Sequence, residues 1–179
     1  MSPGYQCPMM VSIFNLLNPI FNMKKIIRVS WEPKQSLLST TLCGRMDEED
    51  IAEWKEMLQM SIDAIPDDTL FRLLANFTGV EAVNANVHAV FRMSLPHLLA
   101  QYDCRLSFLN LFPETAIELS SKRGIRCRAI ANVVEDAARM GDYDYRFASE
   151  QEGFFNDLNE ALQWLNKVTA TKMQLQQRA

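Results

Sequence analysis

Two asparagines at the predicted start of a helix are the residues best placed to bind a charged group. Asn84 and Asn86 precede an apolar stripe, so we expect the helix to begin at one of them. Backbone N–H groups in a first helical turn have no partner within the helix, so they can bind a small anion or a partner's carboxylate. Simple N-capping is the more common role of asparagine at this position. Both interpretations stay open.

The densest basic cluster of the chain is a second candidate site, and it comprises Lys122, Arg123, Arg126 and Arg128. Alternation in a strand predicts that Arg126 and Arg128 share one face. Such a face would suit a phosphate or an acidic partner, although a solvated strand face is the ordinary explanation. Because the formal net charge is −4, we expect no general nucleic-acid-binding role.

The remaining reactive residues form no recognised catalytic or metal-binding pattern. His88 and His97, the only histidines, are nine residues apart and therefore lie on nearly opposite sides of one helix. The four cysteines are widely spaced, and no Gly-x-Ser-x-Gly, P-loop or Gly-x-Gly-x-x-Gly motif occurs. Glu135 and Asp136 form an acidic pair, but consecutive acids usually cap a helix. We therefore predict no catalytic residue, no metal and no cofactor.

Length and composition indicate one packed domain in a reducing compartment. The chain has 179 residues, 48% of them hydrophobic, which suits a single core. Scattered cysteines, ten methionines and no secretion signal predict a cytoplasmic protein. The apolar stretch from Met9 to Phe21 is too short to span a membrane, and Met23-Lys24-Lys25-Ile26 resembles a chain start. We expect residues 1–22 to lie outside the fold; a short amphipathic anchor is the alternative.

From Met23 onward the pattern alternates strands and helices. It predicts an α/β domain over 23–168, with one mixed sheet of about five strands and flanking helices, followed by a polar tail over 169–179. The predicted strands cover 26–31, 36–43, 69–77, 104–111 and 125–134. The first two form a hairpin, and Gly44 ends the second. In the fifth, alternation predicts one face carrying Cys127, Ala129, Ala131 and Val133.

The predicted helices begin after Asp47, near Asn84, at Pro113 and after Asp157, where capping or proline signals occur. Pro96 inside the second helix predicts a kink, or a new helix capped by Ser94. Gly124 is expected to end the third helix. Residues 135–155 are predicted to be irregular. If exposed together, the aromatic residues around this loop would form a binding patch; they are Tyr143, Tyr145, Phe147, Phe154 and Phe155.

Two parts of this order resemble a known family. The hairpin, Gly44, the acidic-capped helix, the buried strand and Thr78-Gly79-Val80 resemble STAS-like domains related to anti-sigma-factor antagonists. The run FFNDLNEALQWL, which begins at Phe154, resembles the end of small bacterial STAS-like proteins, where an aromatic strand leads into an acidic cap and a helix. The resemblance covers roughly 23–168 and implies a stand-alone STAS-like fold.

In antagonists of this family, a serine at the start of the helix after the central strand is phosphorylated to break partner binding. The matching positions here are Asn84, Ala85, Asn86 and Val87, and none carries a hydroxyl group. Together with Thr78, the first three form our candidate ligand- or partner-binding site. The resemblance thus implies a module without the phosphoserine switch.

We therefore predict a non-enzymatic module that binds a protein partner or a small ligand, with a homodimer as an open possibility. Two alternatives remain. One is a carrier or sensor of an apolar ligand held between the two middle helices and the sheet, beside Phe91, Leu95 and Leu98. The other is an enzyme of unrecognised type, which would need polar groups converging in one pocket.

Overall fold

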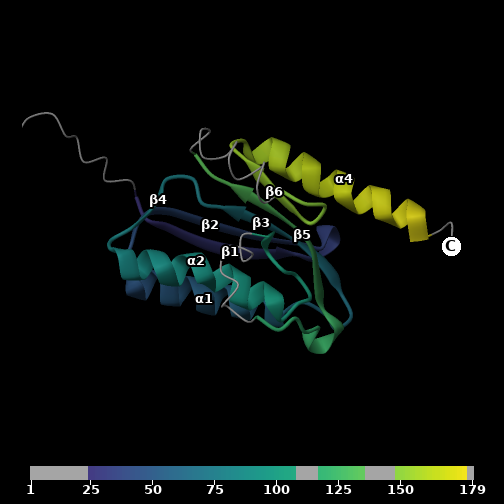
Figure 1. Ribbon diagram of the computed structural model, residues 1–179, viewed down its shortest axis with the longest axis horizontal. Coiled ribbons are helices and arrows are strands. Elements are labelled where there is room, and N and C mark those ends of the chain that lie inside the picture. Colours follow the sequence, from purple (N-terminus) through teal and green to yellow (C-terminus); the bar gives the residue numbers. More distant parts are fainter. Residues whose placement is uncertain (1–23, 108–116, 136–147, 177–179) are drawn as a thin grey trace, which may run out of the picture.

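The computed structural model describes the backbone of residues 24–107, 117–135 and 148–176, and side chains up to Val168. Six strands form one mixed sheet in the order β1-β2-β3-β5-β6, with β4 paired to the end of β2 (Figure 1). In chain order they are β1 (Ile26–Glu32), β2 (Leu37–Met46), β3 (Leu70–Asn76), β4 (Val80–Ala82), β5 (Arg126–Val133) and β6 (Glu152–Phe155). β1 is antiparallel to β2, and the other pairs are parallel.

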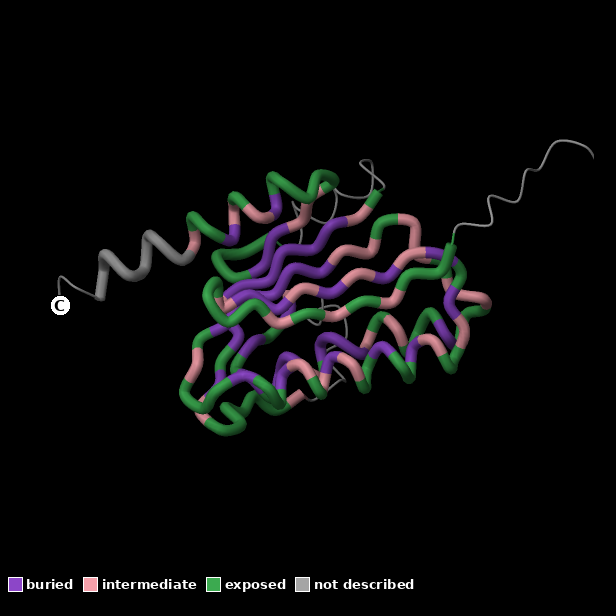
Figure 2. The backbone as a smooth tube through the Cα atoms, turned by 180° about the vertical axis from the view of Figure 1, so that it is seen from behind, coloured by how far each residue is buried: buried purple, intermediate pink, exposed green. Residues whose placement is uncertain are grey.

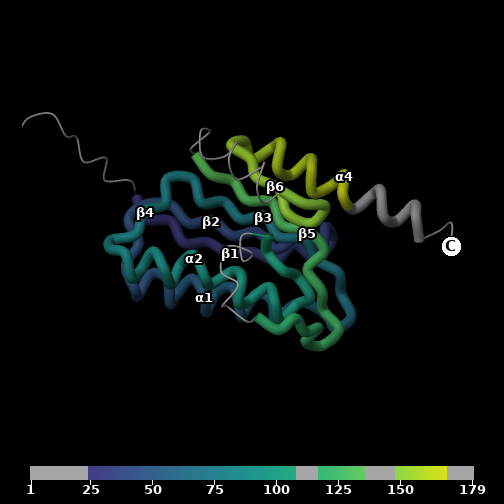
Figure 3. The backbone as a smooth tube through the Cα atoms, in the orientation of Figure 1, coloured from purple at the N-terminus to yellow at the C-terminus, as the bar shows by residue number. Residues whose placement is uncertain are grey.

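Three helices cover the two faces of the sheet. The helices α1 (Glu48–Asp63) and α2 (Ala85–Ala100) lie on one face, and α4 (Leu158–Gln176) crosses the other (Figure 3). The buried residues concentrate in the central strands between these layers (Figure 2). This arrangement confirms the predicted fold class, with one strand more than the expected five.

The β1–β2 hairpin forms as predicted. A 3-10 turn at Pro33–Gln35 joins strands that pair from Ile26 with Cys43 to Glu32 with Leu37. Ile27, Val29 and Trp31 pack toward the core, whereas the alternate residues of β1 are exposed. The period of two in the sequence therefore predicts correctly which face of β1 packs toward the core.

The first helix also begins where the sequence predicts. The Asp47 carboxylate accepts hydrogen bonds from the backbone N–H groups of Glu49 and Asp50, and the Asp50 carboxylate in turn accepts one from the Asp47 N–H. Trp54 on the buried face donates from Nε1 to the Thr40 hydroxyl at 2.7 Å, and both residues are almost fully buried. This bond ties α1 to the middle of β2.

Several predicted boundaries are wrong. Gly44 does not end the second strand, because β2 continues to Met46 and pairs there with β4. Gly44 takes a φ of 94°, which favours glycine, and its N–H donates to the Gly79 carbonyl at 2.9 Å. The short parallel strand β4, which no local sequence pattern indicates, therefore extends the sheet beyond Gly44.

The fifth strand contains a β-bulge that changes its faces. Phe71 pairs with Cys127 but Arg72 pairs with Ala129, so Arg128 is the extra residue. As a result Cys127 packs in the core under α1 and α2, whereas Ala129, Ala131 and Val133 pack under α4. The prediction that all four share one face is wrong. The bulge also interrupts the alternation from which we predict that Arg126 and Arg128 share one face.

The predicted segments between α2 and β5 also differ. Residues 104–107 form no strand, and the rest of the expected 104–111 strand lies outside the described residues. Residues 117–121 are not helical; only Lys122–Gly124 forms a 3-10 turn, so the helix expected to end at Gly124 is absent from this described part.

Two helices are longer than expected. A single helix α2 runs through Pro96, and Ser94 lies inside it with its hydroxyl donating to the Val90 carbonyl. The backbone of α4 stays helical to Gln176, into the predicted tail. Residues 152–155, expected to be irregular, form β6, whereas Tyr143, Tyr145 and Phe147 lie outside the described residues.

The Trp54–Thr40 hydrogen bond gives a first test. Thr40→Val keeps the shape of the side chain but leaves the buried indole N–H without an acceptor, and we expect a loss of about 1–3 kcal/mol in the free energy of unfolding. In a Trp54→Phe background the same Thr40→Val change should cost little, because the donor is gone. Urea unfolding of the four proteins measures the difference, and equal costs in both backgrounds would contradict this account.

Candidate functional site

A crevice of about 340 Å³ opens at the carboxyl ends of β2, β3 and β5, beside the first turns of α2. Ligands of parallel α/β sheets commonly bind at this edge. Apolar side chains line the inner part of the crevice, including Met46, Ile51, Phe77 and Phe91. Three ionisable and exposed side chains lie at its rim, and they are Glu81, His88 and Glu135.

An aromatic cluster fixes the inner wall of this crevice. The Phe91 ring lies 5.0 Å from the Phe77 ring and 5.5 Å from Trp54, and the centroids of Trp54 and Phe77 are 5.8 Å apart. Edge-to-face contacts of this kind stabilise aromatic pairs beyond their buried area. Trp54 is itself held by Thr40, so the wall is in place without a ligand.

The four residues predicted as a binding site flank the crevice rather than line it. Asn84 is the N-cap of α2, and its Oδ1 accepts the Val87 N–H at 2.9 Å. The Thr78 N–H and hydroxyl both donate to Asn76 Oδ1, at 3.1 and 2.7 Å. Ala85 and Asn86 are exposed on the first helical turn. Anion binding there stays a prediction, and the two carboxylates at the neighbouring rim favour cationic groups instead.

The predicted basic cluster has members in different surroundings. Arg123 Nε bonds Asp67 Oδ1 at 2.7 Å, while its guanidinium N–H groups donate to the Asp63 and Ile65 carbonyls at the end of α1. Arg128, at the bulge, is half-buried, and its Nε and Nη2 have no hydrogen-bond partner in the described chain. Lys122 and Arg126 are exposed. A phosphate site at these residues stays a prediction.

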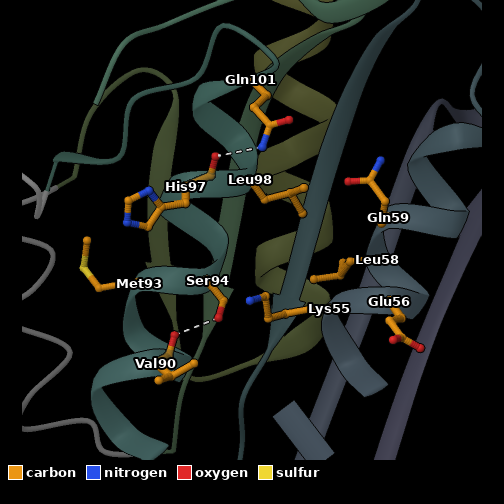
Figure 4. A pocket seen from close by; sticks show the side chains of 10 residues that line it. All are labelled: Lys55, Glu56, Leu58, Gln59, Val90, Met93, Ser94, His97, Leu98 and Gln101. Carbon is orange, nitrogen blue, oxygen red and sulfur yellow. Dashed lines mark hydrogen bonds between the residues drawn. The ribbon is translucent and has the colours of Figure 1, made fainter. Parts of the chain in front are cut away.

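A second hollow of about 590 Å³ is a surface groove between α1 and α2 (Figure 4). Leu58, Val90 and Leu98 supply apolar surface, and Lys55 reaches from α1 toward α2. The groove lies along the outside of the helix pair. Beside Phe91, which the apolar-carrier prediction names, the rings of Trp54, Phe77 and Phe91 pack together, and the carrier stays a prediction.

A buried carboxylate was not predicted. Glu152, 2% exposed, lies at the start of β6, where Oε2 accepts the Ser107 N–H at 2.7 Å and Oε1 accepts from Asn132 Nδ2 at 3.4 Å. Burial raises the pKa of Glu152 to about 7, although both hydrogen bonds oppose the shift. It lines neither hollow. Nothing in the local sequence distinguishes it from exposed acids nearby, because its hydrogen-bond partners, Ser107 and Asn132, are 45 and 20 residues away.

The two central cysteines are packing residues. Cys104 and Cys127 are both buried, and contact with the Cys104 thiol together with burial raises the pKa of Cys127 well above its usual range. A thiol with a raised pKa is a poor nucleophile at neutral pH. Within the described ranges, no group of three or more His, Cys, Asp or Glu residues is arranged to hold a metal, and no helix is long and apolar enough to cross a membrane.

Comparison with known proteins finds a structural likeness and no sequence match. No protein-family model and no curated protein matches the sequence. Among solved structures, the chain is similar to an uncharacterised protein of the DUF3478 family with a SpoIIAA-like fold, from Shewanella loihica PV-4. The two are 12% identical with a TM-score of 0.42, and the match covers 78% of this chain and 92% of that one. The SpoIIAA-like fold of that protein is of the STAS-like class that the sequence of this chain resembles.

Glu152 gives a test of the buried site. Its pKa of about 7 in the folded state exceeds the ordinary 4.5, so the folded protein holds this proton more tightly than the unfolded chain does. Its contribution to stability is therefore full below about pH 4.5 and is lost as pH rises to 7, by at most about 3 kcal/mol. Glu152→Gln should remove this slope, while the exposed Glu118→Gln should keep it. Urea unfolding between pH 5 and 8 measures both, and a wild-type slope in Glu152→Gln would refute the assignment.

Proposed function

We propose that this protein is a non-enzymatic binding module whose crevice at the carboxyl edge of the sheet holds a partner protein. The observation that carries the proposal is the combination of an apolar inner wall with a rim bearing Glu81 and Glu135. This chemistry fits an apolar side chain of the partner flanked by lysine or arginine. A small ligand with the same apolar and cationic parts is the alternative occupant.

The preformed wall supports a binding role. A partner side chain that enters an already ordered pocket loses less free energy to rearrangement than one that must order the pocket first. Rim charges add specificity and speed of association more than affinity. Because Asn84, Ala85 and Asn86 carry no hydroxyl groups, release by serine phosphorylation at these positions is not part of the proposal.

An enzyme is the weaker alternative. General acid–base chemistry needs titratable groups with perturbed pKa values that converge in one pocket. The carboxyl group with the large shift, Glu152, lines neither hollow, while the ionisable groups of the crevice are exposed to solvent. The separation of these two features favours recognition over catalysis.

A carrier of an apolar molecule is a second candidate, and the groove between α1 and α2 favours it. The groove is larger than the crevice, and Val90, 50% exposed, forms part of its apolar lining. An extended apolar molecule would lie along the helices there, outside the aromatic cluster.

Charge reversal at the rim tests the proposed function. Tagged wild-type protein and the variants Glu81→Lys, Glu135→Lys and Glu118→Lys are used to capture partners from native lysate. Glu118 is exposed and lines neither hollow, so it is a control with the same change of charge. We expect the two rim variants to lose one captured protein by about tenfold or more and the control to keep it, because each reversal places like charges together.

Equal capture by all four proteins, or no specific capture by any of them, would contradict a partner-binding crevice. Circular dichroism of the variants separates a local loss of binding from unfolding.

Native mass spectrometry tests the carrier alternative. If an apolar molecule occupies the groove, protein purified without denaturant should show added mass that Val90→Glu removes and Leu119→Glu retains. Leu119 is a matched control, since it is 46% exposed and lies outside the groove. An unliganded mass for the wild-type protein would count against a carrier.

A further inference from the structure

In the part of the chain that the structure describes, the outer edge of β1 has no partner strand. β1 is last in the sheet order, and no described strand pairs with its outer side. Free N–H and C=O groups on such an edge form a template for another strand, so proteins usually blunt edges with proline, bulges or extra charge. The seven residues of β1 contain no proline, and their register with β2 is continuous. The only charged residues in the strand are Arg28 and Glu32.

Apolar side chains border this edge on the side of α1. Ile27, Val29 and Trp31 pack toward the core but remain only partly buried. Lys25 Nζ binds the Asp50 carboxylate at 2.6 Å, which shows that this side of α1 faces β1. Met57 follows Asp50 by two helical turns on the same side, and Met60, 72% exposed, lies on the next row outward. The edge is therefore apolar as well as unpaired.

The charges of β1 are complementary to those of a second β1. Arg28 and Glu32 lie on the other face of the strand, both exposed and without an ion pair in the described chain. When two β1 strands pair antiparallel about Ser30, Arg28 of each lies opposite Glu32 of the other. Val29 then lies opposite Trp31 of the second copy. Each ion pair and each apolar pair occurs twice, because the pairing is symmetric.

We propose that two copies of this chain associate through β1, antiparallel about Ser30, and join their sheets into one. The two-fold axis that relates the two copies is perpendicular to the sheet. The two α1 helices therefore lie side by side, and their exposed Met60 side chains come to the interface. A symmetric pairing of this kind uses the free edge of both copies and closes at two. The proposal is independent of the crevice, whose rim charges Glu81 and Glu135 are outside β1.

Charge exchange tests the surface and its register. The full chain, 20.5 kDa, should sediment as a dimer of about twice that mass at micromolar concentration. Arg28→Glu or Glu32→Arg alone places like charges opposite each other twice, and we expect each to raise the dissociation constant about tenfold or more. The double variant Arg28→Glu/Glu32→Arg restores both pairs and should restore the dimer. Arg105→Glu, at an exposed arginine between α2 and β5, makes the same change of charge as Arg28→Glu and should have no effect.

Three results would overturn the proposal. These are a wild-type monomer at 100 μM or above, a dimer that resists both single reversals, and failure of the double variant to recover. If the protein is monomeric and the β1 amides still exchange slowly with deuterium, the edge is covered within the same chain instead. Since none of these variants alters the rim, loss of dimerisation and loss of partner capture can be told apart.

Discussion

The parallel strands β3 and β5 are buried on both faces, and this constraint organises the molecule. Leu73 and Ile130 face the core under α1 and α2, while Leu74 and Ala131 face the smaller core under α4. Parallel pairs need such cover because their crossover connections place helices against the sheet. α4 packs on β3, β5 and β6, and the outward-facing residues of β1 are exposed in the described part of the chain. The extent of the sheet that α4 covers therefore decides which polar strand residues are exposed.

Polar groups inside the molecule connect elements that are distant in sequence. Arg72, buried in β3, donates to the Leu165 carbonyl and Asn166 Oδ1 in α4 and to the Gln35 carbonyl in the hairpin turn. Burial lowers the pKa of Arg72, a cost that hydrogen bonds of a charged donor offset. Glu152 connects β6 to residue 107 in a similar way, but no cation balances its charge among the described ion pairs. That difference explains why its proton is held near neutral pH.

The sequence predicts the elements whose signals are local. The hairpin, the Asp47 cap, the start of α2 at Asn84 and the Asp157 cap of α4 all depend on residues within one or two turns, and all appear where expected. Gly44 wrongly predicts the end of a strand when only its neighbours are considered. Its left-handed conformation instead accompanies a pairing with β4, more than thirty residues away. The bulge at Arg128 depends on the register with β3, so alternation within β5 alone cannot reveal it. For the same reason the burial of Glu152 cannot be predicted from its neighbours in sequence, because its partners Ser107 and Asn132 are brought to it by the fold.

In the candidate site, the start of α2 and the adjoining sheet edge have different chemistry. Asn84 uses its side chain to cap α2, so it stabilises the helix and is not itself free for a ligand. The ionisable side chains that line the crevice come from β4, from α2 one turn further on and from the second residue after β5. A phosphate at the helix start would add negative charge close to Glu81, a repulsion that the favourable helix dipole would have to overcome. An acidic rim at this position is better matched to a cationic partner than to a phosphate-dependent switch, and the absence of a hydroxyl group at positions 84–86 is consistent with that electrostatic arrangement.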